Sequence, residues 1–244
     1  MGIKYKVNES FFDSWSEEMA YVLGYIYADG SLENAFYIRG QYLRISSTDK
    51  ITIDNIKNIL DSGHKIVETP AYNNNKKQFL LRIGSHKLYK SLLEKGLYPN
   101  KSLTIKFPRI SKKYLKDFIR GYFDGDGCVH IEKRKNKENK LLISRLCVIF
   151  SSGSKSFLEG LSEILSKITK QNKKKIYKNG DTFQLKYSTR DSVELFKFMY
   201  TDVKDKIFLE RKLKIFRKYF DLRSKRVDKK VSFVLEYING HVVK

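Results

Sequence analysis

Two aspartates, each followed by a glycine, have the residue type and spacing for metal chemistry. Asp29 and Asp126 lie 126 − 29 = 97 residues apart, and each ends a stretch with the apolar periodicity of a helix. The C-terminal end of a helix prefers cations, so an aspartate there is disfavoured unless a positive charge is near. Mg²⁺ prefers such oxygen ligands and can activate water for attack on a phosphate. A single Asp-Gly would more simply be a helix-terminating turn, but two matched copies favour a shared metal site.

The segments that position these aspartates belong to an internal repeat. Residues 16–32 read SEEMAYVLGYIYADGSL and residues 113–129 read KYLKDFIRGYFDGDGCV. Residues 43–47 and 148–152 then repeat a strand-like run that ends in two serines. A helical pattern, two further strand-like runs and a closing amphipathic helix follow in each half, which reads α-β-β-α-β-β-α. We therefore expect an α+β fold of two pseudo-symmetric halves with antiparallel sheets.

The repeat predicts a domain organisation. Residues 1–95 form the N-terminal half, 96–111 a proline-containing extended linker, 112–220 the C-terminal half and 221–244 a basic tail. In that tail Val231, Phe233, Leu235 and Tyr237 alternate as in a strand.

Glycines inside the two repeated helices predict how the helices pack. Gly24 and Gly121 each destabilise a helix by about 1 kcal/mol relative to alanine. Because small residues let two backbones approach closely, their matched placement predicts an interface between the two helices.

The amino-acid composition restricts which kind of binding partner the protein can have. With 49 Lys+Arg against 27 Asp+Glu the net charge is +22, which favours nucleic acid over the alternative of an anionic membrane surface. No run of about 20 apolar residues is present, so no membrane partner is expected. The N-terminal residues lack the apolar core of a signal peptide, so we expect an intracellular protein, cytoplasmic if prokaryotic and organellar if encoded in an organelle.

The cysteines and histidines give no metal pattern in the sequence. Cys128 and Cys147 are the only cysteines, too few for a disulfide framework or a cysteine-rich zinc site. We expect Cys128 to be a small buried residue. The four histidines show no metal-ligand spacing, and His130 is the one expected to contact a nucleic acid.

The two motifs, VLGYIYADG at 22–30 and IRGYFDGDG at 119–127, resemble those of single-chain LAGLIDADG homing endonucleases. The resemblance covers about residues 16–220. It implies a monomer whose two sheets form a DNA-binding saddle, and which cuts a long asymmetric site to leave short 3′ overhangs during intron homing. It also implies Mg²⁺ bound by Asp29 and Asp126 with the backbone carbonyls of Ala28 and Gly125, whereas Ca²⁺ would bind without supporting cleavage. One departure is Tyr27, where the second copy has Asp124.

The resemblance also nominates residues beyond the metal site. Arg82 and Lys186 match a basic residue near the scissile phosphate, and Ser47 and Ser152 loosely match a polar position that orients water. Strand faces are expected to read the major groove, and lysines near hairpin tips to meet phosphates. The base-contact candidates are Arg39, Gln41, Arg44, His130, Glu132 and Arg134, and the phosphate candidates are Lys76, Lys77, Lys173, Lys174 and Lys175. A solvated surface charge is the alternative at each position.

Two other function classes remain open. An intron RNA maturase or a non-cleaving transcription regulator could use the same fold, and retention of both acids favours the nuclease over a pure binder. A repeat-built protein-interaction module does not explain the charge. We therefore expect a monomeric endonuclease for double-stranded DNA, with intron RNA as the alternative partner.

Overall fold

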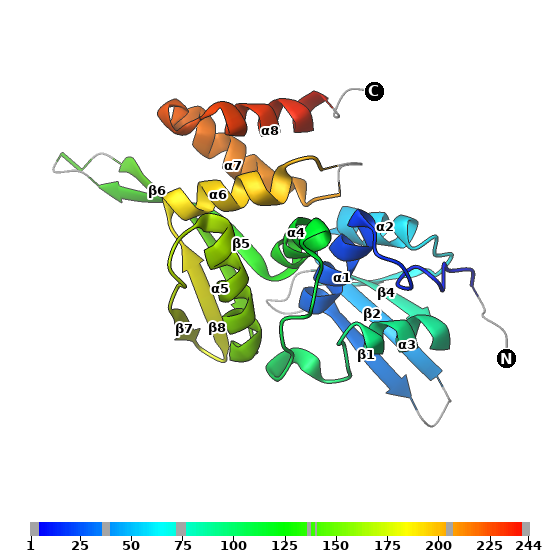
Figure 1. Ribbon diagram of the computed structural model, residues 1–244. Coiled ribbons are helices and arrows are strands. Elements are labelled where there is room, and N and C mark those ends of the chain that lie inside the picture. The colour runs from blue at the N-terminus through cyan, green and yellow to red at the C-terminus, as the bar shows by residue number, and fades with distance from the viewer. Residues whose placement is uncertain are drawn as a thin grey trace. The chain divides into compact units, whose positions relative to one another are not determined.

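The computed structural model describes residues 5–35, 40–71, 77–135, 138–139, 141–203 and 207–240 (Figure 1). Two of the nominated residues, Arg39 and Lys76, lie outside these ranges. The chain divides into two compact units, Met1–Gly125 and Asp126–Lys244.

The first unit contains the first copy of the repeat and most of the helix that begins the second. Its main elements are α1 (Glu17–Asp29), β1 (Gly30–Ala35), β2 (Gly40–Ser47), α2 (Lys50–Ile59), β3 (Ile66–Thr69), β4 (Gln78–Gly84), α3 (His86–Glu94), η2 (Lys101–Leu103), η3 (Lys112–Tyr114) and α4 (Leu115–Asp126). Serines cap the starts of α1 and α3: the Ser16 hydroxyl accepts from Met19 N at 3.0 Å, and the Ser85 hydroxyl from Leu88 N at 3.1 Å. The division between the units comes at Gly125, the penultimate residue of α4.

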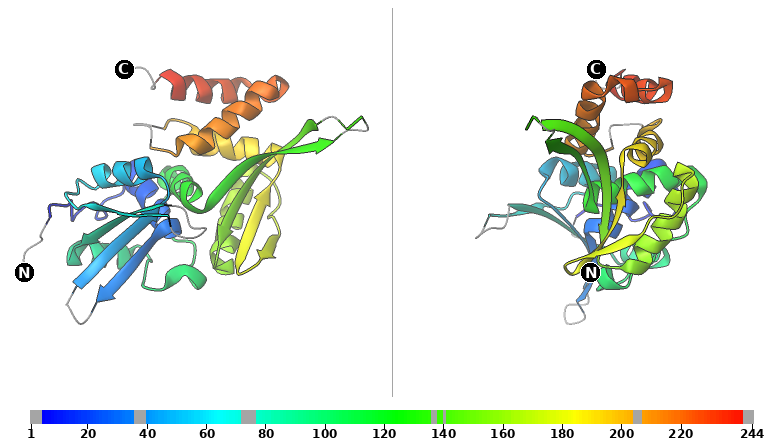
Figure 2. Two further views of the ribbon diagram at one scale, coloured as in Figure 1. Left: turned by 180° about the vertical axis from the view of Figure 1, so that it is seen from behind. Right: turned by 90° about the vertical axis from the view of Figure 1, so that its left-hand side faces the viewer.

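The second unit repeats the same order of elements and adds two helices. It contains β5 (Gly127–Lys135), β6 (Leu141–Ser152), α5 (Lys155–Thr169), β7 (Ile176–Asn179), β8 (Thr182–Tyr187), α6 (Thr189–Tyr200), α7 (Glu210–Leu222), η4 (Ser224–Arg226) and α8 (Lys229–Gly240). Figure 2 shows the long β5–β6 ribbon extending beyond the shorter β7 and β8.

The described residues form two four-stranded antiparallel sheets with matching strand orders, β1-β2-β4-β3 and β5-β6-β8-β7. The α+β class and the repeated α-β-β-α-β-β-α order predicted from the sequence are confirmed. Strand alternation assigns the two faces of each sheet. Leu43, Ile45 and Leu81 are buried under the helices of the first sheet, and Leu146, Val148 and Phe150 under those of the second (Figure 1).

The opposite face of each sheet is open and polar, and it carries Arg44 and Arg82 in the first sheet and His130, Glu132 and Lys186 in the second. In the first sheet the row Ser31, Arg44 and Arg82 runs across β1, β2 and β4. In the second sheet the row Cys128, Ile149 and Lys186 runs across β5, β6 and β8. Each row starts one residue after the glycine that follows Asp29 or Asp126, so the two rows occupy equivalent places in the repeat.

The strand-like interpretation of the C-terminal tail is wrong, because this segment forms the helix α8. Val231, Val234 and Ile238 are buried, with the spacing of three and four that one face of a helix requires. Phe233 remains 53% exposed, so the apolar alternation does not mark a strand face. α8 packs on α6, which accounts for its buried side.

Residues 96–111 contain η2 and otherwise neither helix nor strand. No helix among the described residues has the length and apolar character needed to cross a membrane.

Candidate functional site

Close contact between α1 and α4 sets the geometry of the site. A Cβ added to Gly24 would lie 2.1 Å from Phe118 O, and a Cβ added to Gly121 would lie 2.0 Å from Tyr21 O. Real Cβ atoms do not approach carbonyl oxygens so closely. The two glycines therefore let the helix backbones touch reciprocally, each against the other helix.

The Asp29 carboxylate lies against the last turn of α4. A Cβ added to Gly125 would be 2.4 Å from Ala28 Cβ and 3.2 Å from Asp29 Oδ2. Asp126 is the next residue and ends α4, and both aspartates are half-buried. Neither helix has a basic residue in its last turn. Carboxylates and helix C-terminal carbonyls thus accumulate negative charge, and this oxygen-rich donor set fits a hard divalent cation.

Tyr25 connects Asp29 to the end of β2. Its side chain is 1% exposed. Burial, and next the negative charge of Asp29, hold the pKa of Tyr25 far above its ordinary value, while a hydrogen bond with Ser47 acts in the opposite direction. The phenol therefore stays protonated beside the Asp29 carboxyl group.

Buried polar groups stabilise the same helix pair. Tyr21 Oη donates to Asp124 Oδ2 at 2.9 Å, and burial followed by the Asp124 charge raises the pKa of Tyr21. One turn earlier, Arg120 Nη2 and Asp117 Oδ1 form an ion pair at 2.8 Å in which both side chains are at most 2% exposed. The departure from symmetry at Asp124 is thus a buried hydrogen-bonding position in the helix contact.

Strand pairing places Arg82 and Lys186 at equivalent positions on the open faces. Arg82 is opposite Arg44, and Lys186 is opposite Ile149. The Arg82 guanidinium lies 3.7 Å from the centre of the Tyr42 ring and donates to Glu33 Oε1 at 3.1 Å. Two neighbours that the sequence did not reveal, Glu33 and Tyr42, therefore hold Arg82, whereas Lys186 is exposed.

The other first-sheet candidates divide between the two faces. Arg44 is exposed on the open face, 3.9 Å from the carboxylate of Glu33. Gln41 alternates with Leu43 and Ile45 on the helix-covered side, where its Oε1 lies 2.9 Å from His86 Nδ1. Arg44 is therefore the described base-contact candidate of this sheet that faces outward.

Ser47 and Ser152 occupy equivalent strand ends. The Ser47 hydroxyl accepts from Asp49 N at 3.0 Å, and the Ser152 hydroxyl accepts from Ser154 N at 3.1 Å. Each serine thus turns the chain from a strand toward the following helix. Their matched position follows the repeat, and the structure gives them this local backbone role.

The lysines before β7 are not at a hairpin tip, so that prediction is wrong. The β7–β8 hairpin turns after Asn179, whereas these lysines lie at the opposite end of β7, between α5 and β7. Lys173 pairs with Glu163 at 3.4 Å, and Lys174 pairs with Asp191 at 2.9 Å. Lys175 lies 5.7 Å from the centre of the Tyr177 ring. Lys77 does lie directly before β4 at the β3–β4 turn and pairs with Glu68.

The second sheet brings together three side chains that the sequence treated separately. His130 is opposite Cys147, and Glu132 is opposite Arg145, with which it forms an ion pair at 3.3 Å. Arg134 is exposed farther along β5, and Glu132 pairs with Arg145 across the strands. Burial, and then the charge of Glu132, raise the pKa of the Cys147 thiol. The expectation that Cys128 is buried is wrong, because it lies exposed on the open face.

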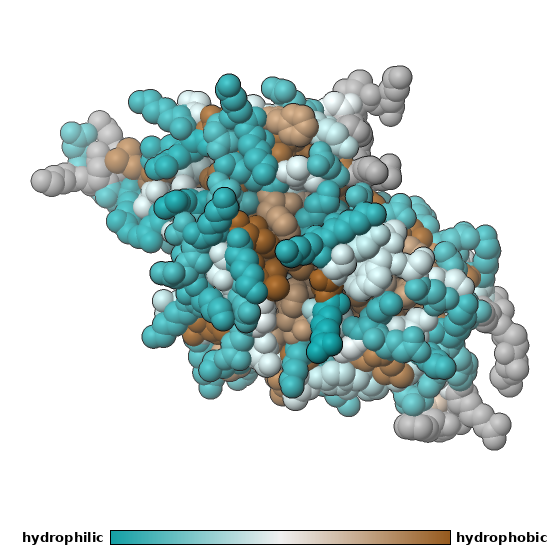
Figure 3. All heavy atoms as spheres, viewed as in Figure 1, coloured by the Kyte–Doolittle hydropathy of each residue, from teal (hydrophilic) through white to brown (hydrophobic). Residues whose placement is uncertain are grey.

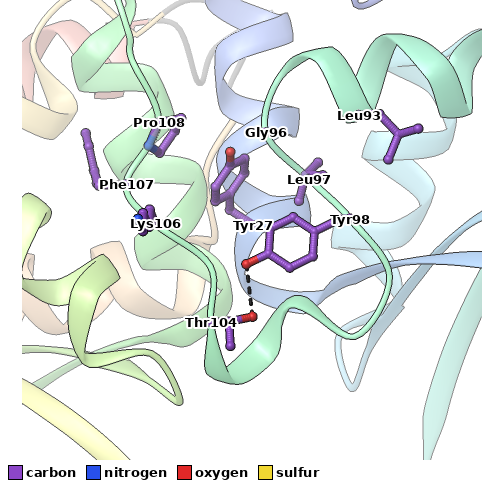
Figure 4. A pocket seen from close by; sticks show the side chains of 9 residues that line it. All are labelled: Tyr27, Leu93, Gly96, Leu97, Tyr98, Thr104, Lys106, Phe107 and Pro108. Atoms are coloured by element: carbon purple, nitrogen blue, oxygen red, sulfur yellow. Dashed lines mark hydrogen bonds between the residues drawn. The ribbon is translucent and has the colours of Figure 1, made fainter.

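A pocket of about 550 Å³ lies in the first unit between α1, the end of α3 and the segment that follows (Figure 4). Tyr27 Oη donates to Lys95 O at 2.7 Å, and Tyr98 Oη donates to Thr104 Oγ1 at 3.0 Å. The Tyr27–Lys95 bond, with Lys101 Nζ donating to Tyr27 O at 2.8 Å, fastens this part of the chain to α1, while the Tyr98–Thr104 bond is internal to the segment. The pocket contains no cluster of acids, so we assign it a structural role.

The fold defined by these elements is that of the single-chain LAGLIDADG homing endonucleases. A LAGLIDADG homing endonuclease, I-LtrWI bound to its target DNA, matches with a TM-score of 0.58 and 12% identity over 94% of this chain and 97% of that one. The meganuclease I-AabMI bound to uncleaved DNA matches with a TM-score of 0.56 and 15% identity over 88% and 96%. I-SmaMI, bound to an uncleaved DNA target in the presence of calcium ions, matches with a TM-score of 0.56 and 12% identity over 95% and 100%.

The sequence agrees with the fold in the second half of the chain. Residues 113–199 match the family model of LAGLIDADG-like domains. The resemblance first noted in the two motifs is thereby confirmed, by sequence over residues 113–199 and by fold over most of the chain.

Curated relatives come from Methanocaldococcus jannaschii. A probable translation initiation factor IF-2 is 30% identical over 178 residues, which are 64% of this chain and 13% of that protein. An uncharacterised protein is 27% identical over 183 residues, 68% of this chain and 61% of its own length. The chain therefore spans less than two thirds of both relatives.

Proposed function

We propose that this protein is a site-specific endonuclease for double-stranded DNA that uses Mg²⁺ held by Asp29 and Asp126. The observation that carries the proposal is the glycine-mediated contact of α1 and α4, which brings the Asp29 carboxylate to the last turn of the helix ending in Asp126. A pure binder has no need to collect carboxylates at two helix C-termini. The net charge of +22 and the DNA-bound state of the structural relatives support DNA as the partner.

Several residues of this chain have distinct roles in the proposed reaction. Asp29 and Asp126, with the carbonyls of Ala28 and Gly125, would hold the ion. When bound, Mg²⁺ supplies charge stabilisation and an activated water. Tyr25, protonated and close to Asp29, positions that carboxylate. Arg82 and Lys186, equivalent on the two open faces, would stabilise negative charge on the phosphates of the two strands.

The remaining features complete the proposal. The open faces of both sheets would form a saddle on a long asymmetric target, read in part by Arg44, His130 and Glu132. The products would carry short 3′ overhangs, and the monomer would serve the homing of an intron. Ser47 and Ser152, the outward-facing Arg134 and the lysines of both halves would contribute at most secondary contacts to the DNA.

Cleavage of a randomised library of duplex DNA with Mg²⁺ tests the proposal. The parent should cut a defined sequence, whereas Asp29→Asn and Asp126→Asn should each bind the same DNA and fail to cut it. Asp54→Asn is the matched control, because Asp54 lies on α2 in a half-exposed pair with Lys50. Replacing Mg²⁺ by Ca²⁺ should preserve binding and stop cutting.

Two outcomes would overturn the nuclease. If the parent binds duplex DNA but never cuts it with Mg²⁺, the protein is a non-cleaving DNA binder. If it prefers structured intron RNA to every duplex, the maturase alternative replaces the proposal. If the Asp29→Asn variant cuts DNA as the parent does, the assignment of the metal ligands is wrong.

A further inference from the structure

A histidine, a carboxylate and a thiol meet on the open face of the second sheet. We propose that His130, Glu132 and Cys147 form a binding site for a thiophilic divalent cation of the Zn²⁺ class, separate from the aspartate site. In the first half the positions equivalent to His130 and Cys147 are Glu33 and Tyr42, which hold Arg82 instead. The new site is therefore a feature of the second half alone.

Strand pairing explains why the three side chains converge. His130 on β5 lies directly opposite Cys147 on β6, and Glu132 is two residues along β5 on the same face. A register shift follows immediately after Glu132. Such bulges bend a strand and re-aim its side chains. The pairing therefore fixes the three Cβ positions through the backbone.

The distances suit a tetrahedral ion. One ligand atom from each of the three residues lies within 4.8 Å of the others. Bonds of about 2.0 Å to nitrogen or oxygen and about 2.3 Å to sulfur place tetrahedral ligand atoms about 3.3–3.5 Å apart. Side-chain rotations that bring the ligand atoms about 1 Å closer together would therefore close the site without moving a strand.

The donor set selects the metal. Thiolate and imidazole favour Zn²⁺ and related transition ions, whereas Mg²⁺ and Ca²⁺ favour sites made of oxygen alone. Cys147 is 9% exposed, while His130 and Glu132 are half-buried, so three protein ligands would leave a fourth position open to water. Thiolate and carboxylate together balance the charge of a divalent ion.

Neighbouring cations limit the affinity but do not block the site. Arg145 Nε contacts one oxygen of Glu132 at 3.3 Å, and a carboxylate has a second oxygen for a metal. Lys186 is exposed on the same face, opposite Ile149. An occupied site would tie His130 and Glu132 to the ion and withdraw them from DNA. This consequence rests on the proposed function, whereas the metal site does not.

Titration with Co²⁺, a spectroscopic substitute for Zn²⁺, tests the site in the reduced full chain. We expect one Co²⁺ per chain with a thiolate-to-cobalt charge-transfer band that Zn²⁺ removes by competition. Cys147→Ser should abolish the band. His130→Gln and Glu132→Gln should each weaken binding by at least about 10–100-fold, the range typical of losing even an outer-shell partner.

Cys128→Ser is the matched control, since Cys128 is the other cysteine and lies exposed on β5, the strand of His130 and Glu132. It should keep the band, as should Asp29→Asn, which removes only the proposed Mg²⁺ site. Absence of a stoichiometric band in the parent, or a band that survives Cys147→Ser, would overturn the proposal. Loss of the band in Cys128→Ser would overturn the assignment of these three ligands.

A separate measurement addresses the effect on DNA. Stoichiometric Zn²⁺ should weaken duplex binding by the parent and leave Cys147→Ser unaffected. If Zn²⁺ binds the parent yet does not change its DNA affinity, the inhibitory consequence is wrong while the metal site stands. Because the Co²⁺ band is read without DNA, failure of the nuclease proposal does not affect it.

Discussion

Arg82 is a residue whose environment was invisible in the sequence. Its guanidinium stacks on Tyr42 and donates to Glu33, so its orientation is fixed before any DNA is present. Planar stacking and a forked donor are properties of arginine that lysine does not share. If the proposed nuclease function holds, this fixed side chain would be available to a phosphate on the open face.

Substitution of Arg82 should separate cutting from binding. We expect Arg82→Ala to lower the single-turnover cleavage rate by about 10²–10³-fold, the typical cost of losing one donor to a developing charge. Arg82→Lys should lie between Arg82→Ala and the parent. Arg44→Ala, on the adjacent strand position, should weaken DNA affinity and leave the rate at saturating enzyme nearly unchanged. Equal rate losses for Arg44→Ala and Arg82→Ala would contradict a specific role for Arg82.

His64 gives the first sheet a dependence on pH. Gly84 N donates to His64 Nε2 at 3.3 Å, so Nε2 must be unprotonated and Nδ1 carries the hydrogen toward Ser62 Oγ at 3.0 Å. Burial, and next the charge of Lys57, hold the pKa of His64 below its ordinary value. Protonation would break the contact with Gly84 at the end of β4.

Protonation of His64 is linked to unfolding, so the protein should become less stable as the pH falls. Because the folded pKa is depressed, the unfolded chain takes up the proton first, and the free energy of unfolding should fall as pH drops below about 6.5. Denaturant unfolding between about pH 7.5 and pH 5 measures it. His64→Gln should flatten that part of the profile. A parent that gains stability over this range would contradict the assignment.

At the scale of elements, the α1–α4 contact depends on two glycines. Alanine is the better helix former by about 1 kcal/mol, so Gly24→Ala and Gly121→Ala would stabilise an isolated helix. In this protein the new methyl group would meet a carbonyl oxygen at about 2 Å and force the helices apart. We expect each variant to lower the free energy of unfolding by about 1–3 kcal/mol, as overpacking does.

The control for this prediction is Gly63→Ala. A Cβ there would meet its nearest atom at 3.6 Å, an ordinary contact, so stability should change little. Denaturant unfolding of the three variants measures the difference. Gly24→Ala with parental stability would mean that the helices do not touch in solution.

At the scale of the molecule, the charge of +22 is the dominant feature. Figure 3 shows hydrophilic side chains over most of the face it presents, with apolar ones in scattered patches. If DNA is the partner, such a charge would neutralise phosphates and release counterions, so we expect the affinity to depend steeply on salt. The charge attracts nucleic acid in general, while the strand faces would provide the choice of sequence.

The salt dependence can be measured directly. If the protein contacts about 6–10 phosphates, its DNA affinity should fall by about 10³–10⁵-fold between about 50 and 200 mM salt. Lys77→Ala, at the β3–β4 turn, should reduce the logarithmic slope by about one unit if that lysine meets a phosphate. A shallow slope in the parent would argue against a DNA partner.

The order of elements could be predicted from the sequence because it rests on local information. Strand alternation, helix periodicity and a motif that occurs twice are all properties of neighbouring residues. The prediction was wrong in residues 229–240, where alternating apolar residues also contain the helical spacing of Val231, Val234 and Ile238. Packing of α8 against α6 favours the helical spacing over the strand alternation.

The two aspartates show the same difference between what local sequence predicts and what tertiary packing sets. The repeated motif was enough to predict that Asp29 and Asp126 end two equivalent helices, and that Gly24 and Gly121 let those helices meet. Which side chains face one another across strands depends on the tertiary structure, since register joins residues far apart in the chain. Glu33 with Arg82, and His130 with Cys147, are neighbours through hydrogen-bonded pairing that no local pattern records.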